Sequence, residues 1–189
     1  MEPELAGGML RFLALAGRLK ETARAGWALR GNVPPESVAD HSFRVALLAL
    51  VLSGDADPPL DRERCVAMAL VHDLAESLVG DITPYDGVST EEKHRREREA
   101  MEHLAALAGD PRLLRLWEEY QAAATPEARF VKDLDKLETV LQAAEYEEAR
   151  GTELAEFREM GERRGWLPAT RPVYEALRRV LAEEGTSAG

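Results

Sequence analysis

Four titratable side chains stand in an apolar stretch of this sequence. The segment LVHDLAESLVGDITP (70–84) places His72, Asp73, Glu76 and Asp81 among leucines and valines whose spacing indicates a buried helix. Burying an unpaired charge costs several kcal/mol or forces the group to become neutral. Such residues persist where a metal, a partner charge or a water network compensates for the burial. This segment is therefore the first candidate site.

Two residues of other segments extend this candidate toward a metal site. His41 lies on the apolar stripe of its own predicted helix, and Asp135 interrupts another amphipathic stretch at the edge of its apolar stripe. Imidazoles and carboxylates are natural ligands for Mn²⁺, Co²⁺, Fe²⁺, Ni²⁺ or Zn²⁺. Adjacent helical residues point about 100° apart, so His72 and Asp73 reach one ion from only two sides. His41 and Asp135 would complete the set and leave room for water and a substrate oxygen.

The elements that must position these residues are all predicted to be helices. No convincing alternating strand, internal repeat or low-complexity linker is found, so we expect one all-α domain spanning 1–189. Ser37, Ser89, Asp110 and Thr125 are predicted N-caps, and Gly80 is a predicted C-terminal stop. The expected helices run over about 9–24, 38–52, 61–79, 91–107, 111–124, 126–149, 152–164 and 171–184.

Composition limits the classes of partner. The formal net charge of −11 at pH 7 argues against a nucleic-acid-binding surface. Between residues 11 and 30, however, five residues are basic and one is acidic, either as a solvated helix face or as a local pocket for a small phosphate ester. Cys65 is the only cysteine, which excludes a disulfide within the chain. No signal peptide or bilayer-spanning run is visible, so we expect a soluble, cytoplasmic protein with no membrane partner.

The order of these residues resembles a known superfamily. One histidine, then His-Asp about thirty residues later, then a distant aspartate resembles the pattern of the HD-domain metal phosphohydrolases. Within them, the closest resemblance is to the HD-domain 5′-deoxynucleotidases, and it rests on five segments: RAGWALRGN (24–32), ESVADHSFRVA (36–46), ALVHDLAESLVGDITP (69–84), EEKHRREREAM (91–101) and FVKDLDKLE (130–138). The match covers about 9–150, the expected HD core, and leaves 151–189 as a C-terminal helical appendage.

The resemblance implies a function and a set of metal ligands. It implies a helical bundle with a divalent metal in its core that hydrolyses deoxyribonucleoside 5′-monophosphates to deoxynucleoside and phosphate. By position, His41, His72, Asp73 and Asp135 match the metal ligands. Asp133 is a rival for the last role, but residues two apart on a helix point about 200° apart, so only one faces the site. Asp133 is expected to lie away from the buried edge, and we therefore predict Asp135.

Glu76 and Asp81 match the carboxylates that handle protons and water beside the metal. Such a carboxylate can orient water or protonate the leaving 5′-oxygen. A second interpretation makes Glu76, Asp81 and the Ile82 carbonyl ligands of another cation such as Mg²⁺. Without the resemblance, Glu76 could equally form a salt bridge with an arginine, and Asp81 could cap the turn that follows it. The sequence leaves these roles open.

Arg24 and Trp27 match the substrate-side pair of the family. The planar guanidinium of arginine can donate two parallel hydrogen bonds to phosphate oxygens. A tryptophan ring can pack against the sugar and disfavour a ribose 2′-hydroxyl by steric contact. The alternative for Trp27 is an anchor of the loop in the core. Some bacterial relatives have the two residues adjacent, whereas here Ala25 and Gly26 intervene.

The leading hypothesis is thus a metal-dependent 5′-deoxynucleotidase, a phosphomonoester hydrolase whose partner is a small nucleotide. By analogy with its relatives it would be a homodimer. The alternatives are another HD phosphohydrolase, acting on cyclic nucleotides or alarmones, and a non-catalytic module that senses nucleotides or metal.

Overall fold

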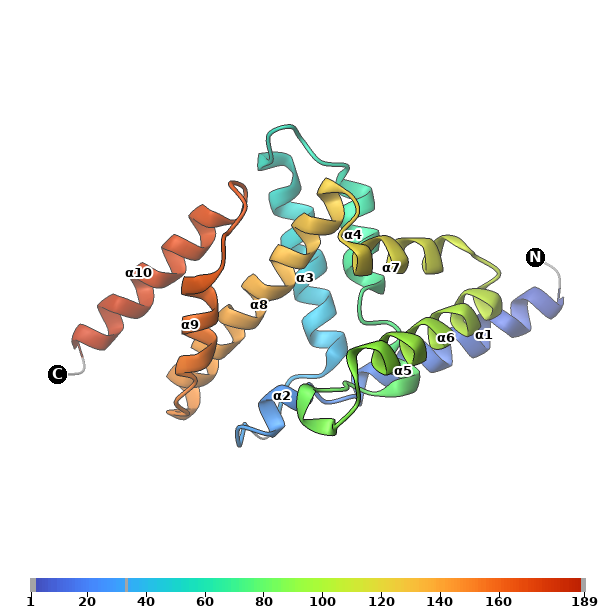
Figure 1. Ribbon diagram of the computed structural model, residues 1–189, viewed down its shortest axis with the longest axis horizontal. Coiled ribbons are helices and arrows are strands. Elements are labelled where there is room, and N and C mark those ends of the chain that lie inside the picture. Colours follow the sequence, from blue (N-terminus) through green and yellow to red (C-terminus); the bar gives the residue numbers. More distant parts are fainter. Residues whose placement is uncertain (1–2, 33, 188–189) are drawn as a thin grey trace.

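The computed structural model describes residues 3–32 and 34–187, and the regular elements in these ranges are helices joined by turns and loops (Figure 1). They contain no strand, only an isolated antiparallel bridge between Ala23 and Ser37, so the all-α prediction is confirmed. None of these helices has the length and apolar character that a bilayer crossing requires. The elements are α1 (Pro3–Ala16), η1 (Gly17–Lys20), α2 (Ala25–Ala28), α3 (Val38–Leu52), η2 (Ser53–Asp55), α4 (Arg62–Val71), α5 (Glu76–Val79), η3 (Pro84–Asp86), α6 (Thr90–Ala108), α7 (Arg112–Ala122), α8 (Pro126–Arg150), α9 (Ala155–Arg163) and α10 (Arg171–Ser187).

Side-chain caps set where several of the helices begin. Ser37 and Asp40 form a capping box at the start of α3: the Ser37 hydroxyl accepts from the Asp40 N–H at 3.1 Å. The side chains of Ser89 and Thr125 likewise accept from backbone N–H groups at the starts of α6 and α8. The prediction for Asp110 is one residue off, because Pro111 holds the cap position of α7.

The predicted helix over 61–79 is wrong at its centre, where His72–Ala75 form a turn between α4 and α5. The His72 Nδ1 donates to the Ala69 carbonyl at 2.6 Å, an acceptor that a continuing helix would use for the Asp73 N–H. Between Leu74 and Leu78, backbone N–H groups donate to the carbonyl three residues earlier instead of four. The turn changes the directions in which Asp73 and Glu76 project.

The first predicted helix also ends earlier than 24. Its α-helical part stops at Ala16, and η1 follows. Beyond η1 the chain becomes extended, because its backbone pairs with the segment before α3. The Arg24 N–H donates to the Glu36 carbonyl at 3.0 Å and the Val38 N–H to the Thr22 carbonyl at 2.8 Å. This pairing places Arg24 beside the start of α3.

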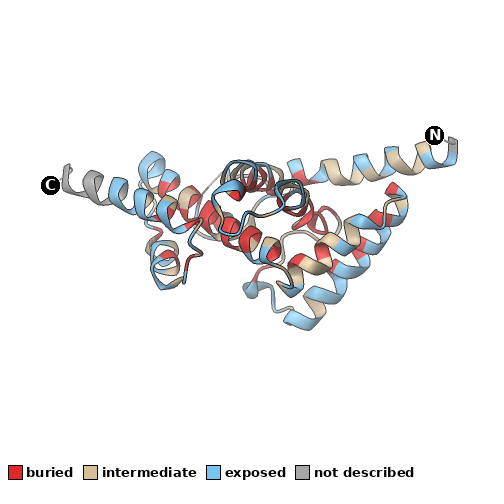
Figure 2. Cartoon of the chain, turned by 90° about the horizontal axis from the view of Figure 1, so that it is seen from above, coloured by how far each residue is buried: buried red, intermediate tan, exposed pale blue. Residues whose placement is uncertain are grey.

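The core lies where α3 and α4 cross α8. Its apolar side chains include Val45, Met68, Phe130 and Leu134, all nearly inaccessible to solvent. A second apolar cluster, around Trp117, joins α1, α6 and α7 to this centre. Figure 2 shows the buried residues gathered in the middle of an elongated molecule and the exposed residues on the helices at its two ends.

Asp133 anchors the C-terminal segment, and the expectation that it lies away from the buried edge is wrong. It is 2% exposed. Its carboxylate accepts from Arg164 Nε at 2.7 Å, from the Leu167 N–H at 3.0 Å and from the Thr170 hydroxyl. The sequence pattern did not show this, because the residues that bury Asp133 follow it by more than thirty positions. It does face away from Asp135.

Candidate metal centre and active site

The four predicted metal ligands converge at the centre of the bundle. His41 comes from α3, His72 and Asp73 from the turn after α4, and Asp135 from α8. His41 Nε2 lies 3.3 Å from His72 Nε2, 3.4 Å from Asp135 Oδ1 and 3.7 Å from Asp73 Oδ2. His72 Nε2 lies 3.2 Å from Asp73 Oδ2. Three segments far apart in the sequence therefore supply one compact group of nitrogen and oxygen donors.

The two imidazoles are oriented for a cation. His41 Nδ1 lies 2.5 Å from Glu138 Oε2, and His72 Nδ1 lies 2.6 Å from the Ala69 carbonyl. Both partners accept hydrogen bonds, so each Nδ1 carries the proton and each Nε2 presents its lone pair when the ring is neutral. Two facing lone pairs repel each other unless a positive charge lies between them. The group of His41, His72 and Asp73 thus fits a divalent metal, with Asp135 adjacent.

The charges of this centre are strongly coupled. Burial and the charge of Arg24 lower the pKa of His41, but contacts with Asp135 and Glu138 outweigh them and raise it to about 9. Burial opposes the charged forms of Asp73 and Asp135, yet the neighbouring cationic groups hold both pKa values below their usual range. Both carboxylates are therefore ionised and available to a cation at neutral pH.

Glu138 is a site residue that the sequence reasoning missed. It is completely buried, and while one oxygen holds His41, the other accepts from Arg44 Nε at 2.8 Å. Arg44 in turn chelates both oxygens of Glu145 at 2.8 Å. Burial raises the pKa of Glu138, but His41 and Arg44 outweigh it and the net shift is downward. The available signal was its position three residues after Asp135, on the same side of α8.

Tyr120 of α7 is a second missed residue. It is buried, and its hydroxyl donates to Asp135 Oδ2 at 3.1 Å. Lys136 Nζ lies 3.1 Å from the same oxygen. Asp135 is thus held from two elements. Nothing in the sequence alone connects a tyrosine of one helix with an aspartate of the next.

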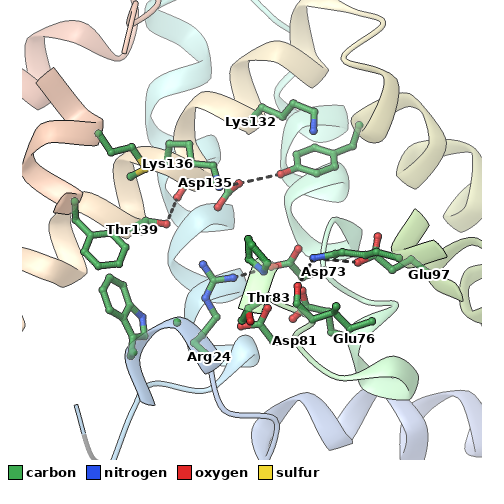
Figure 3. Close-up of a pocket in the computed structure, with 18 of the residues that line it drawn as sticks. Arg24, Asp73, Glu76, Asp81, Thr83, Glu97, Lys132, Asp135, Lys136 and Thr139 are labelled. Atoms are coloured by element: carbon green, nitrogen blue, oxygen red, sulfur yellow. Dashed lines mark hydrogen bonds and ion pairs between the residues drawn. The ribbon is translucent and has the colours of Figure 1, made fainter. Parts of the chain in front are cut away.

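A cavity of about 610 Å³ opens beside the donor group (Figure 3). This volume is in the range of small-molecule sites. Asp73 and Asp135 form part of its wall, and α9 contributes residues that the resemblance had left in the appendage. Its other lining residues include Arg24, Trp27, Glu76, Asp81, Ile82, Lys93, Glu97, Tyr120, Lys132, Lys136, Thr139, Phe157, Met160 and Arg164.

Glu76 lies in the cavity wall without the arginine partner that was one alternative. It is 5% exposed, and among the described residues its Oε2 has no hydrogen-bond partner. Burial, Asp73 and Asp81 together hold the pKa of Glu76 well above its usual range. This carboxyl group therefore keeps a proton at a pH where an ordinary glutamate has lost it.

Asp81 and Ile82 are engaged by the chain itself. Asp81 Oδ2 accepts from the Ala25 N–H at 2.9 Å, so it fastens α2 rather than the turn that follows it, which Thr83 caps. The Ile82 carbonyl accepts from Lys93 Nζ at 2.8 Å. A second cation on this carbonyl would compete with that ammonium group.

Arg24 and Trp27 both reach the cavity. Arg24 lies 3.2 Å from Asp73 Oδ2. Trp27 is 2% exposed, donates to Glu36 Oε1 at 2.7 Å and packs on Phe157 at a centroid distance of 4.5 Å. Trp27 is thus anchored in the core and also borders the cavity, so its position is compatible with either predicted role.

A family model described as HD domain matches residues 16–165. The chain belongs to the HD-domain family. The resemblance seen in the sequence is confirmed, and the matched HD region contains the four predicted metal ligands, Glu76, Asp81 and the whole of α9.

Relatives of this HD-domain protein include an enzyme and solved structures. A protein named 5′-deoxynucleotidase HDDC2 from Homo sapiens is 49% identical over 146 residues, 76% of this chain and 70% of that protein. A conserved hypothetical protein from Pyrococcus furiosus is 34% identical, with a TM-score of 0.78 over 90% of this chain and 99% of that chain. A structure titled as a predicted metal-dependent phosphohydrolase, from Magnetospirillum magnetotacticum, is 29% identical, with a TM-score of 0.70 over 98% of this chain and 97% of that chain.

Proposed function

We propose that this HD-domain protein is a metal-dependent 5′-deoxynucleotidase that hydrolyses deoxyribonucleoside 5′-monophosphates to deoxynucleoside and phosphate. The observation that carries the proposal is the convergence of two imidazole Nε2 atoms and two ionised carboxylates beside a cavity of about 610 Å³, with the two carboxylates in its wall. The human relative named 5′-deoxynucleotidase, 49% identical over 146 residues, supports the choice of substrate.

His41, His72, Asp73 and Asp135 would hold the divalent cation. Their mixed nitrogen and oxygen donors suit Mn²⁺, Co²⁺, Fe²⁺, Ni²⁺ or Zn²⁺. When bound, such a cation supplies positive charge for phosphate oxygens and makes water more acidic. Glu138 and the Ala69 carbonyl keep the imidazoles in the tautomer that can bind it.

Glu76 is the proposed proton donor. Its pKa is raised, so the carboxyl group keeps its proton at a pH where an ordinary glutamate is ionised. Its Oε2 has no hydrogen-bond partner among the described residues. As water oxygen bonds to phosphorus and the bond from phosphorus to the 5′-oxygen breaks, that proton passes to the 5′-oxygen, and one proton of the attacking water returns to the Glu76 carboxylate. Asp81 keeps α2 in place and adds to the field that keeps Glu76 protonated. The alternative is a Mg²⁺ held by Glu76, Asp81 and Ile82, which would have to displace Lys93 from Ile82.

Arg24 and Trp27 form the proposed substrate side. When a cation occupies the centre, Asp73 shares its charge with it, and the Arg24 fork becomes available to a phosphate oxygen. The rigid packing of Trp27 on Phe157 gives its ring a defined edge against which a 2′-hydroxyl would be crowded.

The test is phosphate release from dAMP, dCMP, dGMP, dTMP and dUMP beside AMP and p-nitrophenyl phosphate. The protein is first stripped of metal and then supplied with Mn²⁺, Co²⁺ or Mg²⁺, and an Asp73→Asn preparation controls for contaminating phosphatase. We expect metal-dependent turnover that favours the deoxynucleotides. If no phosphate is released from any monophosphate while the metal is still bound, the proposal is rejected, and cyclic nucleotides and alarmones become the next substrates to test.

A homodimer also stays a proposal. The outer side of α3 exposes four apolar side chains that a second copy could cover: Phe43, Leu47, Leu50 and Val51. Sedimentation velocity of the wild type against Leu47→Glu would show whether this face joins two copies. The cytoplasmic location, the lack of a nucleic-acid partner and the division into a core at 9–150 and an appendage at 151–189 likewise stay predictions.

A further inference from the structure

The basic side chains that line the cavity differ in whether a carboxylate neutralises them. Five such side chains are present: Arg24, Lys93, Lys132, Lys136 and Arg164. Within the described part of the chain, four are paired: Arg24 with Asp73 at 3.2 Å, Lys93 with Glu97 at 3.5 Å, Lys136 with Asp135 at 3.1 Å and Arg164 with Asp133 at 2.7 Å. Among the same residues, Lys132 has no carboxylate oxygen within 4.0 Å of its Nζ. Of these five cations, Lys132 is thus the one without a carboxylate in direct contact.

The backbone directs Lys132 toward the same space as the metal ligand of α8. It precedes Asp135 by three residues, so the two side chains lie on one side of the helix. Its Nζ lies 4.1 Å from the centre of the Tyr120 ring, and the hydroxyl of that ring donates to Asp135. Figure 3 shows Lys132 and Arg24 reaching toward the cavity from opposite sides, with Asp73 and Asp135 between them.

A half-buried ammonium without an anion is in an unfavourable position. Burial lowers the pKa of Lys132, although the charge of Asp135 opposes this shift. A π-face compensates a cation only weakly compared with an oxyanion. A phosphate group that enters the cavity brings the negative charge that the protein does not provide there.

We infer that Lys132 binds phosphate oxygens of the substrate and of the phosphate product, and that it favours dianionic monoesters over monoanionic diesters. The inference rests on the proposed function, since it assumes that a phosphomonoester occupies this cavity. A fixed positive charge attracts a dianion more strongly than a monoanion at the same distance. Lys132 thereby selects substrates by charge, in addition to the proposed selection of deoxyribose over ribose by Trp27.

The experiment compares Lys132→Met and Lys132→Arg with the matched control Arg129→Met. Arg129 lies on α8 three residues before Lys132 and is exposed. Its side chain donates to the Ala123 carbonyl at 3.1 Å. The first readout is calorimetric titration of Co²⁺-loaded protein with inorganic phosphate, beside cobalt content and thermal melting. The second is KM and kcat for dAMP, and the rate ratio for p-nitrophenyl phosphate over bis(p-nitrophenyl) phosphate.

We expect Lys132→Met to weaken phosphate binding and raise KM by about tenfold or more, with cobalt content unchanged and a smaller effect on kcat. The preference for the monoester should fall, Lys132→Arg should recover most of the phosphate affinity, and Arg129→Met should match the wild type. Should Lys132→Met melt early, Lys132→Gln takes its place as the neutral variant, and wild-type phosphate affinity in a neutral variant that keeps its fold rejects the role of Lys132.

The outcomes separate this inference from the proposed function. If the wild type hydrolyses deoxynucleotides and Lys132→Met binds phosphate as well as Arg129→Met does, the role of Lys132 is rejected and the function stands. If the wild type is silent on monophosphates but loses phosphate binding on Lys132→Met, the anion site stands and the function is rejected. Loss of cobalt from Lys132→Met, or no phosphate binding by the wild type, overturns the inference.

Discussion

Two sets of groups around the cavity differ in how completely their polar atoms are paired. On the ligand side, formed by His41, His72, Asp73 and Asp135, each side chain has a partner that orients it, and the remaining imidazole nitrogens face each other. The open groups are Glu76, beside Asp73, and Lys132, beside Asp135 (Figure 3); one carboxyl oxygen of Glu76 and the ammonium of Lys132 have no such partner among the described residues. The ligand side is oriented before anything binds. In the proposed function, the partners of the open groups arrive with the substrate.

Removing a ligand from the ligand side should have the largest effect. We expect Asp135→Ala to lose the divalent cation and to lower kcat/KM for dAMP by roughly a thousandfold or more, because a cation contributes several kcal/mol to charge stabilisation. Atomic emission of dialysed protein measures the metal. Retention of metal equal to that of the wild type would remove Asp135 from the ligand set.

Replacing Glu76, the proposed proton donor among the open groups, should have the next largest effect on activity. We expect Glu76→Gln to keep its metal and lower kcat by about a hundredfold or more. A proton donor acts below its pKa, and that pKa is raised here, so wild-type kcat should decline only on the alkaline side of the ordinary glutamate range. A pH profile of both proteins checks this. An alkaline limb that persists unchanged in Glu76→Gln would assign it to another group.

The coupling of His41 predicts a pH effect on the metal-free protein. Its pKa is about 9 when folded and about 6.5 when unfolded. The stabilisation is therefore fully present below about pH 6.5 and is lost as pH rises to about 9, roughly 3 kcal/mol in all. Urea unfolding across that range measures it.

His41→Gln should flatten the curve, and so should saturation with Co²⁺, because a ligating imidazole has already lost its proton. A metal-free wild type whose stability does not change between pH 6.5 and 9 would show that the Asp135 and Glu138 contacts do not hold the proton on His41.

Asp133 offers a matched contrast to Asp135 on the same helix. Asp133→Ala leaves Arg164, the Leu167 N–H and the Thr170 hydroxyl without their acceptor. We expect a loss of about 2 kcal/mol in the free energy of unfolding, with metal content unchanged. Chemical unfolding and metal analysis of the two alanine variants check both. Metal lost equally from both would break the assignment of the two aspartates to separate sides of α8.

The smallest effect is expected from the residue behind the ligand side. Glu138→Gln should keep the fold but weaken Co²⁺ affinity by at least about tenfold, because His41 loses its charged acceptor. Competition with a chromophoric chelator measures the affinity, and the cobalt absorption spectrum reports the altered ligand geometry. An unchanged spectrum and affinity would show that Glu138 only fills the core.

Local patterns in the sequence predicted much of the fold. The capping residues Ser37, Ser89 and Thr125 and the stop at Gly80 are where the sequence placed them, because a cap depends on groups within a few residues. The break at His72–Ala75 did not follow from these patterns, although the contact behind it spans only three residues. Its apolar spacing is that of a helix, and it is the contact of His72 Nδ1 with the Ala69 carbonyl that competes with the helical bond.

The sequence by itself determined the residue types of the site: two histidines and two aspartates in an order typical of HD domains, with Glu76 and Asp81 nearby. Only the tertiary structure decided which buried charges are compensated. Glu138 is 97 positions from His41, and Asp133 is 31 positions from Arg164. Periodicity reports which face of a helix is buried, but not which distant group faces it. The same packing left Lys132 without a carboxylate in contact among the described residues, whereas the two aspartates whose charges act on it, Asp135 and Asp73, contact Lys136 and Arg24.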